Sequence, residues 1–170
     1  KARGLISPRG RRQKVPRYPK GLVEYGEPNR VWCADFKGPV PLRKGRHCSP
    51  LTISDGHTRY LLCCEALTRT DVSVVRPLFE RAFEQFGLPE LIRTDNGPPF
   101  ASRAPGGLSR LSIWWMKLGI THERIAPGKP TQNGRHERLH RTLELEACPL
   151  PRVSRRAQQL RFDRFRHQYN

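Results

Sequence analysis

The sequence predicts an α/β protein in which helices pack on a mixed β-sheet. Short runs rich in β-branched and aromatic residues, each bounded by turn residues, alternate with segments in which apolar residues recur every three or four positions. The order of these segments is β-β-β-α-β-α-β-α-α, which favours a sheet covered by helices. With 170 residues, the chain is long enough for one domain with a hydrophobic core and a basic extension.

Five segments have the composition of strands. The first, VWCADF at residues 31–36, is bounded by turn residues on both sides and contains one acid among apolar residues. The next two strands are joined by the turn-prone Asp55-Gly56-His57, so the first three are expected to form an antiparallel meander. The remaining predicted strands cover residues 50–55, 59–67, 90–95 and 120–126.

Four segments have the periodicity of helices. The first begins near Val75 and ends at Gly87, with Pro77 expected near its first turn. The second is short, and its expected buried anchors are Trp114, Trp115 and Leu118. The second, third and fourth predicted helices cover residues 108–119, 134–147 and 154–169.

A strong positive charge makes nucleic acid the leading class of partner. The chain holds 32 Lys and Arg against 15 Asp and Glu, a formal net charge of +17 at pH 7, and such a field attracts polyanions. On charge alone, a solvated basic surface is the alternative. Residues 1–27 are predicted to form a basic flexible arm or linker, because residues 1–20 hold eight Lys or Arg and no acid. Residues 28–170 are then the core.

The cysteines and the hydropathy indicate a cytoplasmic protein. The five cysteines include no C-x-x-C pair and lack the regular spacing of a disulfide framework, so reduced thiols are expected. No run of about 18 apolar residues could span a bilayer.

Three acids in separate predicted elements are candidate metal ligands. Asp35 lies in the first strand, Asp95 ends the fourth strand at a glycine turn, and Glu137 lies at the start of the third helix. Converging carboxylates give the oxygen coordination that Mg²⁺ or Mn²⁺ prefers, and two such ions about 4 Å apart assist phosphodiester chemistry. Taken singly, each acid has an alternative role: a solvent-facing strand residue, a turn residue, or an acid favoured by the helix dipole.

Four stretches resemble, in order and character, the catalytic core of bacterial insertion-sequence transposases in the retroviral-integrase superfamily. They are PNRVWCADFKG, PLTISDGHTRYLLC, GLPELIRTDNGPPF and APGKPTQNGRHERLHRTL, within a match from about Pro28 to Asn170. The resemblance implies a ribonuclease H-like fold, with helices on both faces of a mixed five-stranded sheet. It also implies metal-dependent cleavage of the 3′ ends of a DNA element and strand transfer into target DNA, by a homodimer or higher homo-oligomer.

The resemblance further implies roles for individual residues. The family's Asp, Asp, Glu triad corresponds to Asp35, Asp95 and Glu137, which would hold two Mg²⁺ or Mn²⁺ ions. Asn96 is expected to orient the second acid or a metal-bound water. The expected DNA contacts are Lys129, Gln132, Asn133 and Arg141.

Two rival hypotheses come from the same residues. The chain could be a catalytically silent DNA-binding relic of this fold, although the intact triad argues against it. The spacing His136-Glu137-x-x-His140 also matches a zinc-protease motif, but the extended form of that motif places Gly and His where this chain has Leu143 and Glu146. In the transposase interpretation, the two histidines are flanking polar residues in contact with solvent or phosphate.

Overall fold

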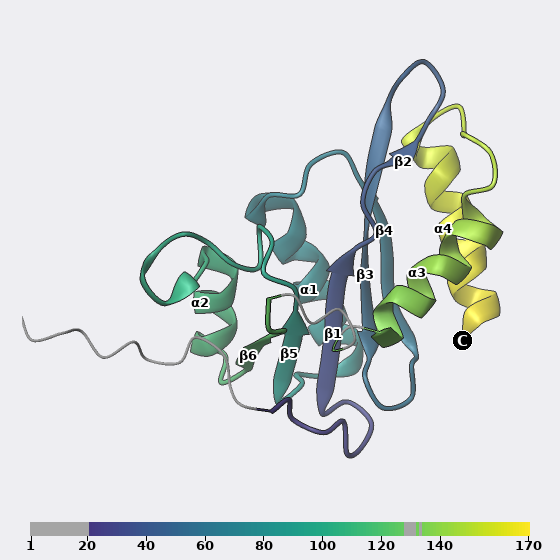
Figure 1. Ribbon diagram of the computed structural model, residues 1–170. Coiled ribbons are helices and arrows are strands. Elements are labelled where there is room, and N and C mark those ends of the chain that lie inside the picture. The colour runs from purple at the N-terminus through teal and green to yellow at the C-terminus, as the bar shows by residue number, and fades with distance from the viewer. Residues whose placement is uncertain (1–20, 128–131, 133) are drawn as a thin grey trace, which may run out of the picture.

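A sheet covered by helices is seen in the computed structural model, which describes residues 21–127, 132 and 134–170 (Figure 1). The predictions for residues 1–20, Lys129 and Asn133 lie outside the described residues. The strands are β1 Val31–Phe36, β2 Val40–Pro41, β3 His47–Asp55, β4 Leu61–Leu67, β5 Leu91–Thr94 and β6 Thr121–Arg124. The helices are α1 Val72–Phe86, the short 3₁₀ helix η1 Pro105–Gly107, α2 Arg110–Lys117, α3 Gly134–Ala147 and α4 Arg155–Tyr169.

The strands form one mixed sheet. β1, β3 and β4 pair antiparallel in sequence order, which confirms the predicted meander. β5 pairs with β1 in parallel, and β6 pairs with β5 in parallel. All five predicted strands are present, but the sheet has six strands because β2 also pairs with β3. β2 has two residues, which is too short for any sequence periodicity to reveal.

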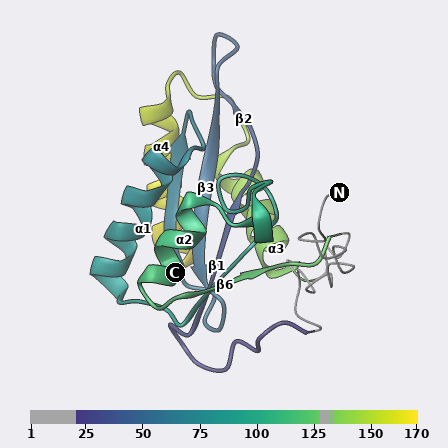
Figure 2. The ribbon, with the colours of Figure 1, turned by 90° about the vertical axis from the view of Figure 1, so that its left-hand side faces the viewer.

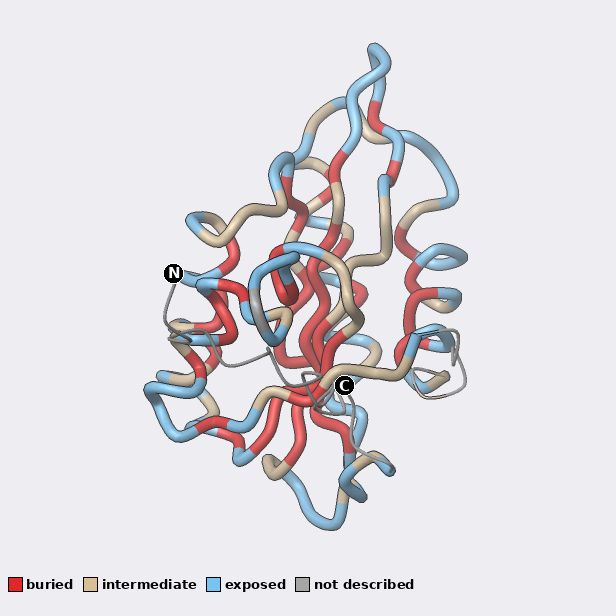
Figure 3. Tube along the Cα trace, turned by 60° about the vertical axis from the view of Figure 1, so that its left-hand side comes forward, coloured by how far each residue is buried: buried red, intermediate tan, exposed pale blue. Residues whose placement is uncertain are grey.

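Two hydrophobic cores lie on opposite faces of the sheet, which confirms helices on both faces. The first core joins Trp32 and Ile53 of the sheet to Phe79 of α1 and Trp115 of α2. The second joins strand residues such as Cys64 to both α3 and α4. Figure 2 shows α1 and α3 on opposite sides of the strands. Figure 3 shows that buried residues concentrate in the strands, while the loop between β2 and β3 is exposed.

Two helices on the first face differ in detail from the prediction. α1 begins at Val72, capped by the Asp71 carboxylate, so Pro77 lies in its second turn instead of near its first. α2 is anchored by Leu111 and Trp115, both fully buried, whereas Leu118 is 39% exposed. Leu118 follows the last helical residue, and the periodicity therefore no longer governs its direction. None of the described helices is long and apolar enough to cross a membrane.

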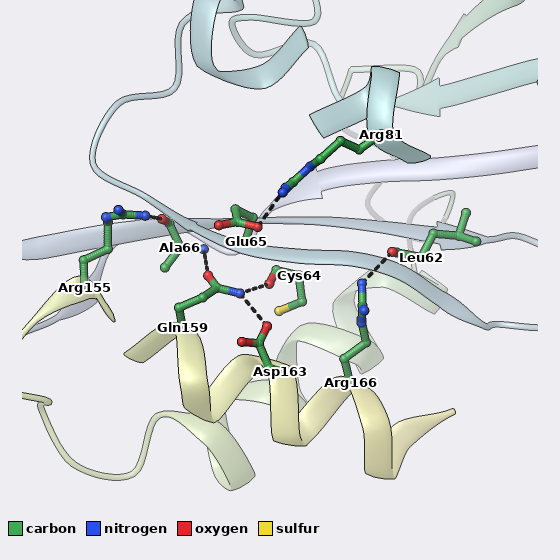
Figure 4. Close-up of polar contacts among 9 residues, drawn as sticks. All are labelled: Leu62, Cys64, Glu65, Ala66, Arg81, Arg155, Gln159, Asp163 and Arg166. Atoms are coloured by element: carbon green, nitrogen blue, oxygen red, sulfur yellow. Dashed lines mark hydrogen bonds and ion pairs between the residues drawn. The ribbon is translucent and has the colours of Figure 1, made fainter. Parts of the chain in front are cut away.

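The basic helix α4 covers the free edge of β4 with polar side chains (Figure 4). The Gln159 amide accepts from the Ala66 N–H at 2.7 Å and donates to the Cys64 carbonyl at 2.9 Å, as a neighbouring strand would. Arg155 and Arg166 donate to other carbonyls of the same strand. An uncovered edge strand invites pairing with another chain, so α4 protects the sheet as well as packing on it.

Candidate active site

The parallel pairing of β1 with β5 brings two of the predicted acids together. The register pairs Ala34 with Thr94, and the next residues in the two strands are Asp35 and Asp95. Neighbouring strands lie about 4.8 Å apart, and residues paired in this way project from the same face of the sheet. Asp35 and Asp95 therefore occupy adjacent positions at the carboxyl edge of the sheet.

The Asp95 carboxylate is half-buried, and hydrogen bonds offset little of the cost of burying its charge. Burial raises the pKa of its carboxyl group above the ordinary value, and the N–H of Gly97, at 3.1 Å from Oδ1, opposes that rise. A Cβ at Gly97 would lie 3.0 Å from Oδ2 of Asp95, so a side chain at this position would press against the carboxylate. A nearby cation would favour the charged form of such a carboxylate.

Asn96 ties the turn after β5 to the end of β6. Its Nδ2 donates to the Ile125 carbonyl at 2.7 Å, while its Oδ1 is buried and has no hydrogen-bond partner among the described residues. A buried amide oxygen without a donor is uncommon in folded proteins. The two aspartate carboxylates are of the oxygen-donor type that Mg²⁺ or Mn²⁺ prefers, and they lie at adjacent strand positions, so this pair fits a divalent cation.

A threonine hydroxyl holds the backbone carbonyl of each aspartate. Thr52 Oγ1 donates to the Asp35 carbonyl at 3.1 Å, and Thr94 Oγ1 donates to the Asp95 carbonyl at 2.8 Å. A hydroxyl has a single hydrogen, so it can donate in only one of its contacts at a time. Sequence reasoning missed both threonines.

Buried histidines form hydrogen bonds with these two hydroxyls. The Nε2 atoms of His136 and His140 both lie 2.7 Å from Thr52 Oγ1, and His122 Nε2 lies 2.9 Å from Thr94 Oγ1. A hydroxyl has one hydrogen, so Thr52 Oγ1 cannot donate to both rings, and at least one of His136 and His140 must carry its proton on Nε2. One hydroxyl, that of Thr52, therefore connects β1, β3 and α3.

The burial of His136 and His140 corrects the prediction that they are flanking polar residues. Burial lowers the pKa of His136 to about 3 and that of His140 to about 4, so both rings are neutral at pH 7. The pKa of His122 is lowered to about 4 for the same reason. The spacing did contain the signal, because residues 136, 139, 140, 143 and 147 recur as one helical face and all are buried. Histidine is a polar residue, so the sequence prediction did not count His136 and His140 as part of the buried face.

Glu137 lies on an exposed part of α3 that is tied to the end of β1. Glu144, two turns further along the helix, forms an ion pair with Lys37 at 3.1 Å. Among the described residues, no group of three or more His, Cys, Asp and Glu side chains is placed to hold a metal ion. The structure thus brings Asp35 and Asp95 together but does not gather Glu137 with them.

The described DNA-contact candidates lie near the start of α3 and along it. Arg141 is exposed. Gln132 is half-buried, and its Oε1 accepts from the Ala126 N–H at 2.7 Å. The zinc-protease alternative gains no support here, because both histidine Nε2 atoms are occupied by Thr52 and the described residues offer no three-ligand group.

The segment before β1 links the middle of the sheet to the start of α3. Arg93 and Glu123 form a buried ion pair at 2.6 Å, and the Val23 N–H donates to Glu123 at 2.8 Å. The Tyr25 ring lies 4.7 Å from the Arg93 guanidinium and 4.0 Å from that of Arg135, in the first turn of α3. This arrangement holds the helix that carries Glu137, and no sequence motif predicted it.

Solved structures with the same arrangement define the class of fold. A chain of the simian T-cell lymphotropic virus intasome matches with a TM-score of 0.65 at 23% identity, over 85% of this chain and 51% of that chain. The magnesium-bound HTLV-2 integrase catalytic core domain, in its trimeric form, matches with a TM-score of 0.52 at 19% identity, over 81% of this chain and 82% of that one. The fold is a ribonuclease H-like α/β core.

Sequence comparison then identifies the family. The chain belongs to the integrase core domain family, whose models match residues 26–130 and residues 118–170. It is 35% identical over 125 residues to the 31.7 kDa protein of insertion element IS407 from Burkholderia multivorans, covering 74% of this chain and 43% of the relative. It is 35% identical over 133 residues to the 39.2 kDa protein of insertion element IS476 from Xanthomonas euvesicatoria, covering 78% and 34%. The chain thus spans less than half the length of these relatives.

All five cysteines are free, as the sequence predicted. Four of them are buried and Cys148 is half-buried. Burial raises the pKa of the Cys63 thiol to about 12, so this thiol is un-ionised at pH 7 and behaves as a small apolar side chain.

Proposed function

We propose that this chain is the catalytic core of a transposase that cuts the 3′ ends of a DNA element and joins them to target DNA. The observation that carries the proposal is the parallel register that places Asp35 beside Asp95 at the carboxyl edge of the sheet. Membership of the integrase core domain family and the resemblance to insertion-element proteins support it. A protein with this activity acts on chromosomal DNA in the bacterial cytoplasm, in association with the nucleoid.

Asp35, Asp95 and Glu137 are the proposed metal ligands and catalytic residues. Two bound Mg²⁺ or Mn²⁺ ions would activate the attacking water or 3′-hydroxyl and stabilise the leaving oxygen. Asp35 and Asp95 supply carboxylates from two adjacent strands, and Asn96 holds the turn that carries Asp95. Glu137 supplies the third carboxylate from α3.

DNA and further copies of the chain are the proposed partners. Lys129, Gln132, Asn133 and Arg141 are proposed to contact the DNA from the loop before α3 and from α3 itself. Their contacts with phosphate would depend on salt and discriminate weakly between sequences. A homodimer or larger homo-oligomer would bring two DNA ends together for joining.

The test compares Asp35→Asn, Asp95→Asn and Glu137→Gln with the unchanged full-length protein. Cleavage and strand transfer are measured with Mg²⁺ and with Mn²⁺, and DNA binding is measured separately. We expect each substitution to abolish both reactions while DNA binding persists. Glu146→Gln is the matched control, because it removes an exposed carboxylate from the same helix.

Two outcomes would contradict the proposal. Full activity of any of the three variants would remove that residue from the active site. An unchanged protein that binds DNA but shows no metal-dependent cleavage would favour the silent DNA-binding relic instead.

A further inference from the structure

A basic hairpin, residues 40–48, projects from the body of the protein with a fixed shape. It consists of β2, a tight turn and the start of β3. Lys44 and Gly45, in the loop of residues 43–45, both have left-handed backbone angles, φ 60° and 67°. The Leu42 N–H closes this loop by donating to the Arg46 carbonyl at 2.7 Å.

The basic hairpin is held against the segment that joins α3 to α4. The Arg43 N–H donates to the Arg152 carbonyl at 2.8 Å, and the Arg46 guanidinium donates to the Val153 carbonyl at 2.7 Å. Leu42 is 5% exposed and belongs to the second hydrophobic core. The cations of the hairpin and of the segment beside it therefore form one surface.

This surface carries positive charge that is mostly not neutralised by ion pairs among the described residues. Residues 37–54 contain four Lys or Arg and no Asp or Glu, and residues 147–162 contain another four and again no acid. Arg43, Lys44, Arg46 and Arg156 are exposed. Within the described part of the chain, only Lys37 among these eight cations forms an ion pair, with Glu144. Such a surface is suited to a polyanion.

The basic hairpin rises beyond the edge of the sheet where the two aspartates lie (Figure 1). Thr52 of β3 pairs with Asp35, and His47, five residues earlier in β3, is where the hairpin joins the strand. Five strand residues span about 17 Å at roughly 3.3 Å each. Duplex DNA advances 3.4 Å per base pair along its axis, so about 17 Å corresponds to about five base pairs.

We infer that the basic hairpin, with Arg152 and Arg156 beside it, binds the phosphate backbone of duplex DNA at least about five base pairs from the phosphate that reacts at Asp35 and Asp95. The spacing rests on the proposed function, but the contact with duplex DNA does not. Guanidinium and ammonium groups on a rigid hairpin meet phosphates as hydrogen-bond donors and charges, and this contact carries no base specificity.

The test removes two charges without disturbing the turn. The variant is Arg43→Gln with Lys44→Asn, because asparagine tolerates the left-handed backbone of position 44. The matched control, Lys117→Gln with Arg164→Gln, removes two exposed cations from α2 and α4. Binding of the full-length protein to a random-sequence 30-base-pair duplex is measured by fluorescence anisotropy between 50 and 300 mM salt.

We expect the hairpin variant to lower the slope of log K against log salt by about 1.8, since each lost phosphate contact contributes about 0.9. At 0.15 M salt this amounts to a loss of affinity on the order of 30-fold. The control should keep the slope of the unchanged protein. An unchanged slope in the hairpin variant, or an equal fall in the control, would overturn the inference.

Two further experiments ask which kind of DNA the hairpin contacts and whether the contact is independent of the proposed metal site. Binding is repeated with a covalently closed plasmid, which has no ends. If the hairpin variant loses affinity for the plasmid, the contact is with target-type DNA. If it loses affinity only for the linear duplex, the contact is with cut ends, and if it loses affinity for neither, the inference is overturned.

Mn²⁺ binding, followed by calorimetry, should be equal in the variant and the unchanged protein. If the unchanged protein binds no metal while the slope still falls, the proposed active site fails and the DNA contact stands.

Discussion

Replacing Thr52 by valine tests the polar connection between β1, β3 and α3. Valine keeps the branched shape and removes the hydroxyl, which contacts the Asp35 carbonyl and the Nε2 atoms of both His136 and His140. Thr52 is fully buried, so water cannot replace the lost acceptor. Leaving a buried donor without a partner costs about 1–3 kcal/mol. The same cost applies to a buried acceptor, so two ring nitrogens left without a partner predict a loss of roughly 2–6 kcal/mol in the free energy of unfolding.

The measurement is urea and thermal unfolding, followed by circular dichroism. For a domain of this size the expected loss lowers the Tm by roughly 4–24 °C, at about 2–4 °C per kcal/mol. Thr52→Ser is the control, because it keeps the hydroxyl and loses only a methyl group, at a cost of about 1 kcal/mol. Mn²⁺ affinity should fall with Thr52→Val and be largely retained with Thr52→Ser, since the hydroxyl positions the Asp35 backbone.

Two results would refute the reasoning on Thr52. One is a valine variant that unfolds within about 0.5 kcal/mol of the serine variant. The other is a long-range ¹H–¹⁵N spectrum of the unchanged protein in which both His136 and His140 carry their protons on Nδ1. The hydroxyl has one hydrogen and cannot donate to both Nε2 atoms, so that pair of tautomers is incompatible with the contacts described above.

Three further predictions follow from burial, the sheet edge and the Asp95 turn. The three buried histidines have pKa values lowered to about 3 to 4, so below pH 6.5 the unfolded chain binds protons that the folded chain does not. The free energy of unfolding should therefore fall from pH 6.5 towards pH 4, by on the order of 2 kcal/mol per histidine at pH 5. A urea midpoint that does not change with pH would contradict this. Gln159→Leu should lower the free energy of unfolding by about 1–3 kcal/mol and increase aggregation measured by light scattering, because the edge of β4 loses two hydrogen bonds. The control Gln168→Leu, at an exposed position of the same helix, should change neither quantity. Gly97→Ala should weaken Mn²⁺ binding measured by calorimetry, because its Cβ would lie 3.0 Å from Asp95 Oδ2, while Gly134→Ala, with no atom within 4 Å, should bind Mn²⁺ as the unchanged protein does.

Local patterns predicted the elements of this fold better than its contacts. VWCADF is a buried, β-branched run between turns, and it forms β1 over the predicted residues. The meander was predictable because consecutive strands with short connections pair antiparallel. β2 could not be predicted, because two residues contain no periodicity and one of them is proline.

The candidate site depends on contacts that only the register fixes. Asp35 and Asp95 could be proposed as ligands from their places at strand ends, but their adjacency follows from the parallel pairing of β1 with β5, two strands that are far apart in the sequence. Thr52 could not be recognised as a partner of α3, because a threonine in a strand points to one face or the other according to that register. His136 was within reach of prediction, since it lies on the same helical face as Leu139 and Leu143.

The neutrality of the histidines suits a cation site in a chain of such high charge. A formal charge of +17 opposes the approach of a divalent ion, and lysine or arginine at these positions would compete with that ion for the carboxylates. His122, His136 and His140 instead hold the aspartate backbones through threonine hydroxyls and carry no charge at pH 7. Burial thus gives the strands rigid support without adding positive charge beside Asp35 and Asp95. The cations of the basic hairpin lie further along β3, about 17 Å from the strand position that pairs with Asp35.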